Sequence, residues 1–120
     1  MIGQRLRSLV LPGVRRTRHP DEAKPARAEW RGTVLAESVE VRTASGYVYF
    51  PPESVRWEHL EPSDHRTVCG WKGVAHYYDI VTGDDRNPNA AWSYPEPLPG
   101  AADLTGWVAF WAGVKVRAAS

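Results

Sequence analysis

No part of this 120-residue chain carries a long uninterrupted helical pattern, because ten Pro and ten Gly residues divide it into short segments. The segments between these breaks are rich in β-branched and aromatic residues, which favour strands. In residues 33–42, Val39 and Val41 alternate with Glu40 and Arg42, which predicts a half-buried strand pair. We therefore expect a mainly β fold: a single small domain of short antiparallel strands that form a compact sandwich or a partly closed barrel, with one or two short helical turns.

The segments that follow predict further short elements. A strand at 47–50 should end at Pro51, because proline cannot donate to a strand ladder. Helical turns are expected within 53–60 and at 101–104. Residues 107–117 predict a hairpin, since two apolar runs flank a two-residue Ala-Gly connection.

The longest predicted strand region covers residues 66–81. Turn residues follow it at 82–85 and at 87–89, and a strand is expected again at 90–94. If 66–81 were one strand, alternate side chains would share a face. One face would then carry Lys72, Val74, His76, Tyr78 and Ile80.

Length and charge indicate one domain with a basic extension. We place the extension at 1–29 and the β domain at 30–118, because 120 residues are too few for two cores. Residues 1–20 contain five Arg and no acid, but the apolar run 8–11 is too short for a secretory signal. Residues 21–120 hold ten basic and fourteen acidic residues, so no nucleic-acid partner is expected.

The lone Cys69 excludes an intramolecular disulfide and the common zinc motifs. A reducing, cytoplasmic location fits best, and no apolar run is long enough to span a membrane. No metal site is expected: His65, His76 and a carboxylate such as Asp64 or Asp79 match no known ligand spacing. Cofactors cannot be assigned from the sequence.

The candidates for catalysis are Cys69 and His76, which lie close in sequence. A neighbouring imidazole or cation can lower the pKa of a thiol and make it a nucleophile. On a regular strand, however, the two side chains would point to opposite faces. A Cys69–His76 dyad therefore needs a bulge, for which Gly70 is the natural place. The alternative is that Cys69 is a small buried thiol.

Four ordered motifs resemble the family catalogued as domain of unknown function 427, and the resemblance covers about residues 30–116. The two most specific patterns are Y-F-P-x-x-x-V at 49–55 and T-x-C-x-x-K-G-x-A-x-Y-Y at 67–78. The resemblance implies a compact, mainly β domain. The family has also carried a nucleotidyltransferase label, but this chain lacks the G-S motif followed by paired aspartates that such chemistry uses to hold magnesium.

The family pattern also highlights a set of rings, a thiol and a cation, and that mixture implies a ligand pocket. The highlighted residues are Tyr49, Pro51, Thr67, Cys69, Lys72, Gly73, Tyr78, Trp92, Tyr94 and Pro95. We expect Tyr49, Thr67, Lys72, Tyr78, Trp92 and Tyr94 to bind the ligand. The chain departs from the pattern at Gly70, where proline is usual, which loosens the backbone beside Cys69.

Three functional hypotheses follow. The first is a protein that binds a small, anionic molecule, with Lys72 meeting the anion and aromatic rings, among them Trp71, forming flat walls. The second is an enzyme that uses Cys69 or His76 in the same pocket. The third is a non-catalytic interaction or oligomerisation module, in which the rings fill the core or form a homo-oligomer interface.

Overall fold

The computed structural model describes residues 15–16 and 25–118. In these residues, ten strands and three short 3-10 turns follow one another along the chain. The strands are β1 (Arg15–Arg16), β2 (Ala26–Trp30), β3 (Thr33–Ser38), β4 (Arg42–Ala44), β5 (Tyr47–Phe50), β6 (Leu60–Cys69), β7 (Gly73–Thr82), β8 (Asp85–Ser93), β9 (Val108–Phe110) and β10 (Lys115–Ala118). The turns are η1 (Pro52–Ser54), η2 (Trp57–His59) and η3 (Pro99–Leu104).

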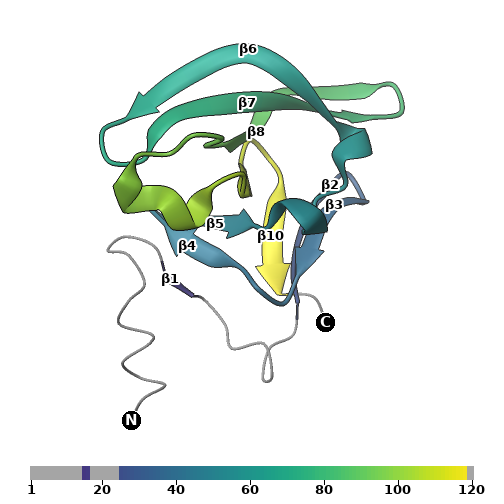
Figure 1. Ribbon diagram of the computed structural model, residues 1–120. Coiled ribbons are helices and arrows are strands. Elements are labelled where there is room, and N and C mark those ends of the chain that lie inside the picture. The colour runs from purple at the N-terminus through teal and green to yellow at the C-terminus, as the bar shows by residue number, and fades with distance from the viewer. Residues whose placement is uncertain (1–14, 17–24, 119–120) are drawn as a thin grey trace.

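The strands form two antiparallel sheets, and neither described sheet closes on itself. The larger has the order β1-β4-β5-β9-β8-β7-β6, and the smaller has the order β10-β2-β3. In Figure 1 the long strands β6 and β7 arch over the top, and the smaller sheet lies below them. This arrangement confirms the predicted mainly β class. No helix in the described part is long and apolar enough to cross a membrane.

Alternation along the central strands sends apolar side chains to both faces of the larger sheet. Phe50, Val108 and Phe110 belong to one buried cluster together with Leu35 of β3, which places this cluster between the sheets. Their strand neighbours belong to a second cluster, which η3 covers through Ala101 and Leu104. That cluster comprises Ala44, Tyr49, Ala75, Trp92, Tyr94, Ala101, Leu104 and Ala109.

Several local predictions are confirmed. The strand at Tyr47–Phe50 ends at Pro51, as expected from proline chemistry. The helical turns predicted within 53–60 and at 101–104 are the 3-10 turns η1, η2 and η3. Their short length is typical of 3-10 helices, whose hydrogen-bond geometry is poorer than that of α-helices.

The strand region predicted over 66–81 is not one continuous strand. The chain instead forms a hairpin of β6 and β7, in which Cys69 pairs with Gly73 around a tight turn. Gly73 has φ +115°, a backbone conformation that side chains with a Cβ rarely adopt. This residue ends the turn and resets the alternation, so residues before and after it do not share one register of faces.

The turn predicted at 87–89 is also wrong, because these residues lie inside β8. The reversal occurs at Gly83 and Asp84, and β8 begins at Asp85. Asn89 adopts φ +52° next to a register shift in the β7–β8 pairing. The residue that favours turns therefore forms a bulge within the strand. Its amide N–H donates to the Asp79 carboxylate at 2.9 Å, which holds that bulge.

The predicted C-terminal hairpin is wrong, although its turn is present. Ala112 and Gly113 have φ +55° and +92° and reverse the chain, but β10 then pairs with β2 in the smaller sheet. The reason is topological: β9 lies between β5 and β8, so it has no free edge for β10. β2 offers the edge that β3 leaves open.

The strands predicted as a pair within 33–42 separate into different sheets: β3 pairs with β2, whereas β4 pairs with β5. β2, which begins at Ala26, lies partly within the segment predicted as an extension and is part of the fold. Of residues 1–20, only β1 is described, and it pairs with β4. The rest of the predicted basic tail lies outside the described residues.

Gly73→Ala should destabilise the protein by about 1–3 kcal/mol, because φ +115° is strained for alanine. The added Cβ would also lie 3.3 Å from the backbone nitrogen of Leu98. Gly70→Ala in the same turn is the matched control, since its Cβ would meet nothing within 4 Å. Urea denaturation of both variants measures the difference, and equal stabilities would contradict this account of the turn.

Candidate functional site

A row of side chains crosses four neighbouring strands on the face that η3 covers. Tyr77 of β7 pairs with Trp92 of β8, Trp92 pairs with Ala109 of β9, and Ala109 pairs with Tyr49 of β5. Paired residues of antiparallel strands point to the same face. Because Ala109 is small, the rings on either side of it approach each other, with the centroids of Tyr49 and Trp92 at 6.3 Å.

The hydroxyl of Tyr49 lies at the centre of this site and is fully buried. It accepts hydrogen bonds from the indole Nε1 of Trp92 and from the ammonium Nζ of Lys72, each at 3.1 Å. Both of these groups can only donate. Burial raises the pKa of Tyr49 well above its usual range, so the phenol stays protonated and uncharged.

Lys72 reaches this hydroxyl from the turn between β6 and β7. Only 3% of the residue is exposed, and Nζ lies 5.3 to 5.5 Å from the ring centroids of Tyr49, Trp71 and Tyr94. Its carbonyl accepts a 2.8 Å hydrogen bond from the Leu98 amide, which fixes the turn. Burial lowers the pKa of Lys72, and the neighbouring Cys69 opposes that shift in part.

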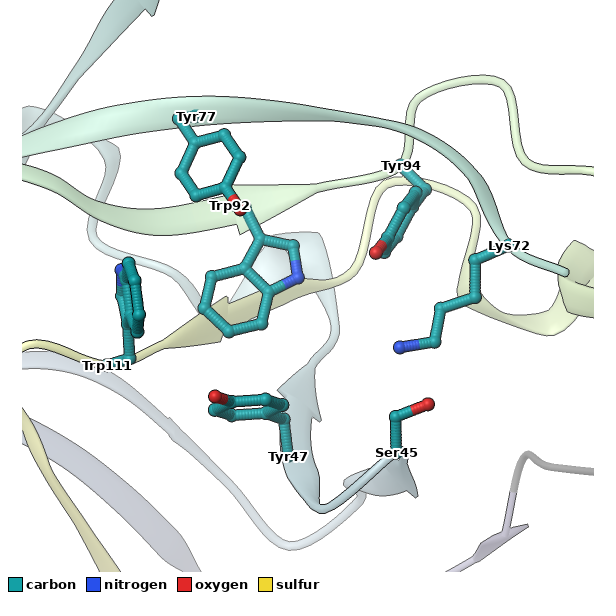
Figure 2. A pocket seen from close by; sticks show the side chains of 7 residues that line it. All are labelled: Ser45, Tyr47, Lys72, Tyr77, Trp92, Tyr94 and Trp111. Atoms are coloured by element: carbon teal, nitrogen blue, oxygen red, sulfur yellow. The ribbon is translucent and has the colours of Figure 1, made fainter. Parts of the chain in front are cut away.

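A pocket of about 180 Å³ opens beside this group. It is lined by Ser45, Tyr47, Lys72, Tyr77, Trp92, Tyr94 and Trp111. Figure 2 shows the ammonium end of Lys72 pointing into the pocket from one side, with Trp92 in the middle and Trp111 at the opposite end. Tyr47 and Trp111 are 38% and 46% exposed, so they form the rim.

The aromatic walls stand largely at right angles to Trp92. Tyr47 and Trp111 meet it edge to face, at 86° and 89°, with centroids 4.8 and 6.1 Å away. Tyr94 closes the inner end. Burial, together with the neighbouring Cys69, raises its pKa to about 12, so it too is a neutral donor at ordinary pH.

The structure brings five of the six predicted ligand residues to this region. Lys72, Trp92 and Tyr94 line the pocket, and Tyr49 lies directly behind them. Thr67 stands outside the wall, where its hydroxyl hydrogen-bonds that of Tyr77 at 3.1 Å. Trp71 was expected to form a wall of the pocket. Its ring instead lies beside the Lys72 ammonium and does not line the pocket.

Tyr78, the sixth residue, lies on the other face of the sheet. It packs against the cluster between the sheets, meets the ring of Trp57 edge to face, and its hydroxyl lies 3.3 Å from that of Ser93. The prediction that Lys72 shares a face with His76 and Tyr78 is wrong. The turn at Gly73 directs Lys72 to the side of Tyr77 instead.

Four lining residues were missed: Ser45, Tyr47, Tyr77 and Trp111. Tyr47 shares the face of Tyr49 by simple alternation, which was a usable signal. Ser45 carried no signal in the sequence. In the structure it lies in the two-residue turn before β5, where its φ of +53° is unusual for serine. Trp111 reaches the pocket because its indole donates to the carbonyl of Asn89 at 2.7 Å, a contact with no sequence signal.

Cys69 and His76, the two residues predicted as candidates for catalysis, do not lie in one site. Cys69 pairs with Gly73 and Thr67 pairs with Ala75, so Cys69 faces the aromatic cluster. His76 pairs with Arg66, which lies three residues before Cys69 on β6, so His76 points to the opposite face. The described residues also contain no group of three or more His, Cys, Asp or Glu side chains that could hold a metal ion.

A scan against family models matches residues 19–119 to the family described as Domain of unknown function (DUF427). The chain belongs to this family. The search of curated proteins found no match. DUF427 has carried a nucleotidyltransferase label, and nucleotidyl transfer uses magnesium held by acidic side chains. The described residues contain no acidic cluster that could hold this ion, so we derive no metal-dependent step.

Tyr49→Phe should destabilise this DUF427 domain by about 1–3 kcal/mol, because it removes the acceptor of two donors and leaves the indole N–H of Trp92 buried without a partner. Tyr47→Phe makes the same chemical change at the exposed rim and should stay within about 0.5 kcal/mol of the parent. Thermal and urea unfolding compare the two. Similar losses in both would show that the Tyr49 hydroxyl is not a structural acceptor.

Lys72→Met should stabilise the protein by about 1 kcal/mol near pH 7, because it removes a buried charge that no described carboxylate pairs with. The gain should shrink as pH rises through the lowered pKa of Lys72, where the native protein sheds this proton before the unfolded chain does. Lys115→Met, at an exposed position of β10, is the control and should be neutral. Melting temperatures across pH 6 to about 10 test the trend, and a destabilised Lys72→Met variant would contradict it.

Proposed function

We propose that this protein binds a small organic anion with a flat apolar body, holding the anionic group at Lys72 and the body between the aromatic walls. The observation that carries the proposal is a buried ammonium group that borders a pocket and makes one hydrogen bond to the described residues, to Tyr49. An ammonium has three donors. The remaining donors are therefore available to a bound group.

The energetics favour an anion. Burying a charge without an opposite charge costs several kcal/mol, and the ring faces around Lys72 recover only part of it. A carboxylate or phosphate entering the pocket would supply the missing charge in a region of low dielectric. A cationic ligand is disfavoured by the same lysine, although aromatic pockets elsewhere hold quaternary ammonium groups.

The pocket size limits the ligand to about one ring. An apolar cavity of about 150 Å³ accepts benzene, and this pocket measures about 180 Å³. Trp92 and Tyr47 offer apolar surface, while the hydroxyls of Ser45 and Tyr94 can orient a polar substituent. Benzoate-like or phenyl phosphate-like molecules have the required dimensions and charge.

We further propose a cytoplasmic location and a small-molecule partner. The single Cys69 supports a reducing compartment. The mild negative charge of residues 21–120 supports the expectation that nucleic acid is not a partner. A homo-oligomer stays a prediction. The register of β6 and β7 does not support an enzyme that pairs Cys69 with His76, and an enzyme that uses Cys69 or His76 alone stays a prediction.

Benzoate, phenylacetate and phenyl phosphate should each quench tryptophan fluorescence on binding, whereas neutral benzamide should bind at least about tenfold more weakly, since a charge-assisted hydrogen bond contributes about 1.5–3 kcal/mol. Lys72→Met should lose that preference and Lys72→Arg should retain it. Tyr78→Phe, on the other face, is the control for a phenolic change outside the pocket. Equal binding of benzoate and benzamide, or no binding by any of the three anions, would overturn the proposal.

Benzoate affinity should fall as pH rises through the pKa of Lys72, because the anion favours the protonated amine. Burial places that pKa below the ordinary lysine value of 10.5, so the fall should begin earlier than for an exposed lysine. Tyr94 does not interfere, since its pKa is about 12. Titrations between pH 7 and about 10.5 measure this, and a constant affinity over the range would contradict it.

A further inference from the structure

We propose that Lys72 forms a Schiff base with a small carbonyl compound, an aldehyde or a 2-oxo acid with a flat ring, that enters the aromatic pocket. The inference rests on the proposed function, because it concerns the same pocket, and it deepens that function by naming the reactive group of the ligand. Amines that act as nucleophiles in proteins lie in apolar surroundings that favour the uncharged form. Lys72 has those surroundings.

The geometry holds one nitrogen at a fixed place on the pocket wall. The Lys72 residue is buried, its Nζ donates to the Tyr49 hydroxyl at 3.1 Å, and three rings enclose the ammonium. Such an amine loses little freedom when a carbonyl carbon approaches, which favours the bimolecular step. Figure 2 shows that the nitrogen faces the space between Tyr94 and Ser45.

The lowered pKa of Lys72 supports the chemistry, since the reactive species is the neutral amine. The chain offers a natural comparison, because it contains three lysines, Lys24, Lys72 and Lys115. Lys115 is exposed on β10. Lys115 therefore serves as the exposed comparison for the buried Lys72 amine.

The reaction balances without an oxidant or a metal. After Nζ gives one proton to water, its lone pair attacks the carbonyl carbon, a C–N bond forms, and the carbonyl π pair moves to oxygen. A proton passes from the nitrogen to this oxygen, which gives the carbinolamine. The carbinolamine then loses its hydroxyl and the remaining N–H proton as water and becomes the imine. Tyr94 lines the pocket and keeps its phenolic proton, so it can donate to the departing oxygen.

The imine also suits the anionic ligand. A protonated imine keeps the positive charge at the position of the Lys72 nitrogen, so the carboxylate of a 2-oxo acid stays next to a cation after the bond has formed. The open rim at Tyr47 and Trp111 lets water leave. The positive charge at the Lys72 nitrogen thus attracts the anion first and stays next to it after the imine has formed.

The test is reductive trapping of the wild-type chain with benzaldehyde or phenylglyoxylate and cyanoborohydride near pH 7, followed by peptide mass mapping. Lys72 should be labelled at least about tenfold faster than Lys115, because the apolar surroundings of Lys72 favour the neutral amine that reacts. The pH at half-maximal labelling should also be lower for Lys72. Cys69→Ser should label equally, which separates the amine from the nearby thiol.

Benzoate binding by the wild type, measured beside the labelling, separates this inference from the proposed function. Benzoate should also protect Lys72 of the wild type from labelling, because it would occupy the pocket that the amine borders. Labelling of Lys72 no faster than Lys115 while benzoate still binds overturns the Schiff base alone. Absence of both overturns both proposals.

Discussion

The Tyr49 hydroxyl joins three parts of the chain that are far apart in sequence. It accepts from Trp92 on β8 and from Lys72 in the β6–β7 turn, while its own ring stands on β5. Both donors are buried, and neither can accept a hydrogen bond. Losing this oxygen would leave two unpaired buried donors, so the position of the lysine, the tilt of the indole and the inner end of the pocket depend on one atom.

That contact depends in turn on small residues beside it. Ala109 lies between Tyr49 and Trp92 on β9, and a larger side chain there would separate the hydroxyl from the indole. Gly73 performs the corresponding role in the turn, because its positive φ and its close approach to Leu98 direct Lys72 inward. The aromatic rings form the pocket walls, but the small residues Ala109 and Gly73 allow the short distances between them.

The sequence predicted the elements whose information is local. Alternation and proline chemistry placed β5 and its end, and the helical turns after Pro51 and before the C-terminal strands were also expected. It could not predict sheet order, because the occupied edges of β9 send β10 to β2. The candidate site likewise combines residues that could be predicted from the sequence with residues that could not. Lys72, Trp92 and Tyr94 were expected from the family resemblance, whereas Trp111 reaches the pocket through a contact with the backbone of Asn89 that depends on a bulge.

The burial of Lys72 separates the binding hypothesis from an interaction module that merely fills its core with rings. A core needs no ammonium, and a methionine of similar length would fill the same space without the cost of removing a charge from water. The described residues set no carboxylate against the ammonium, only phenols, indoles and the nearby Cys69. A cation kept in an aromatic enclosure beside an open pocket is a local departure from stable packing, and such departures are expected where a site serves binding or chemistry.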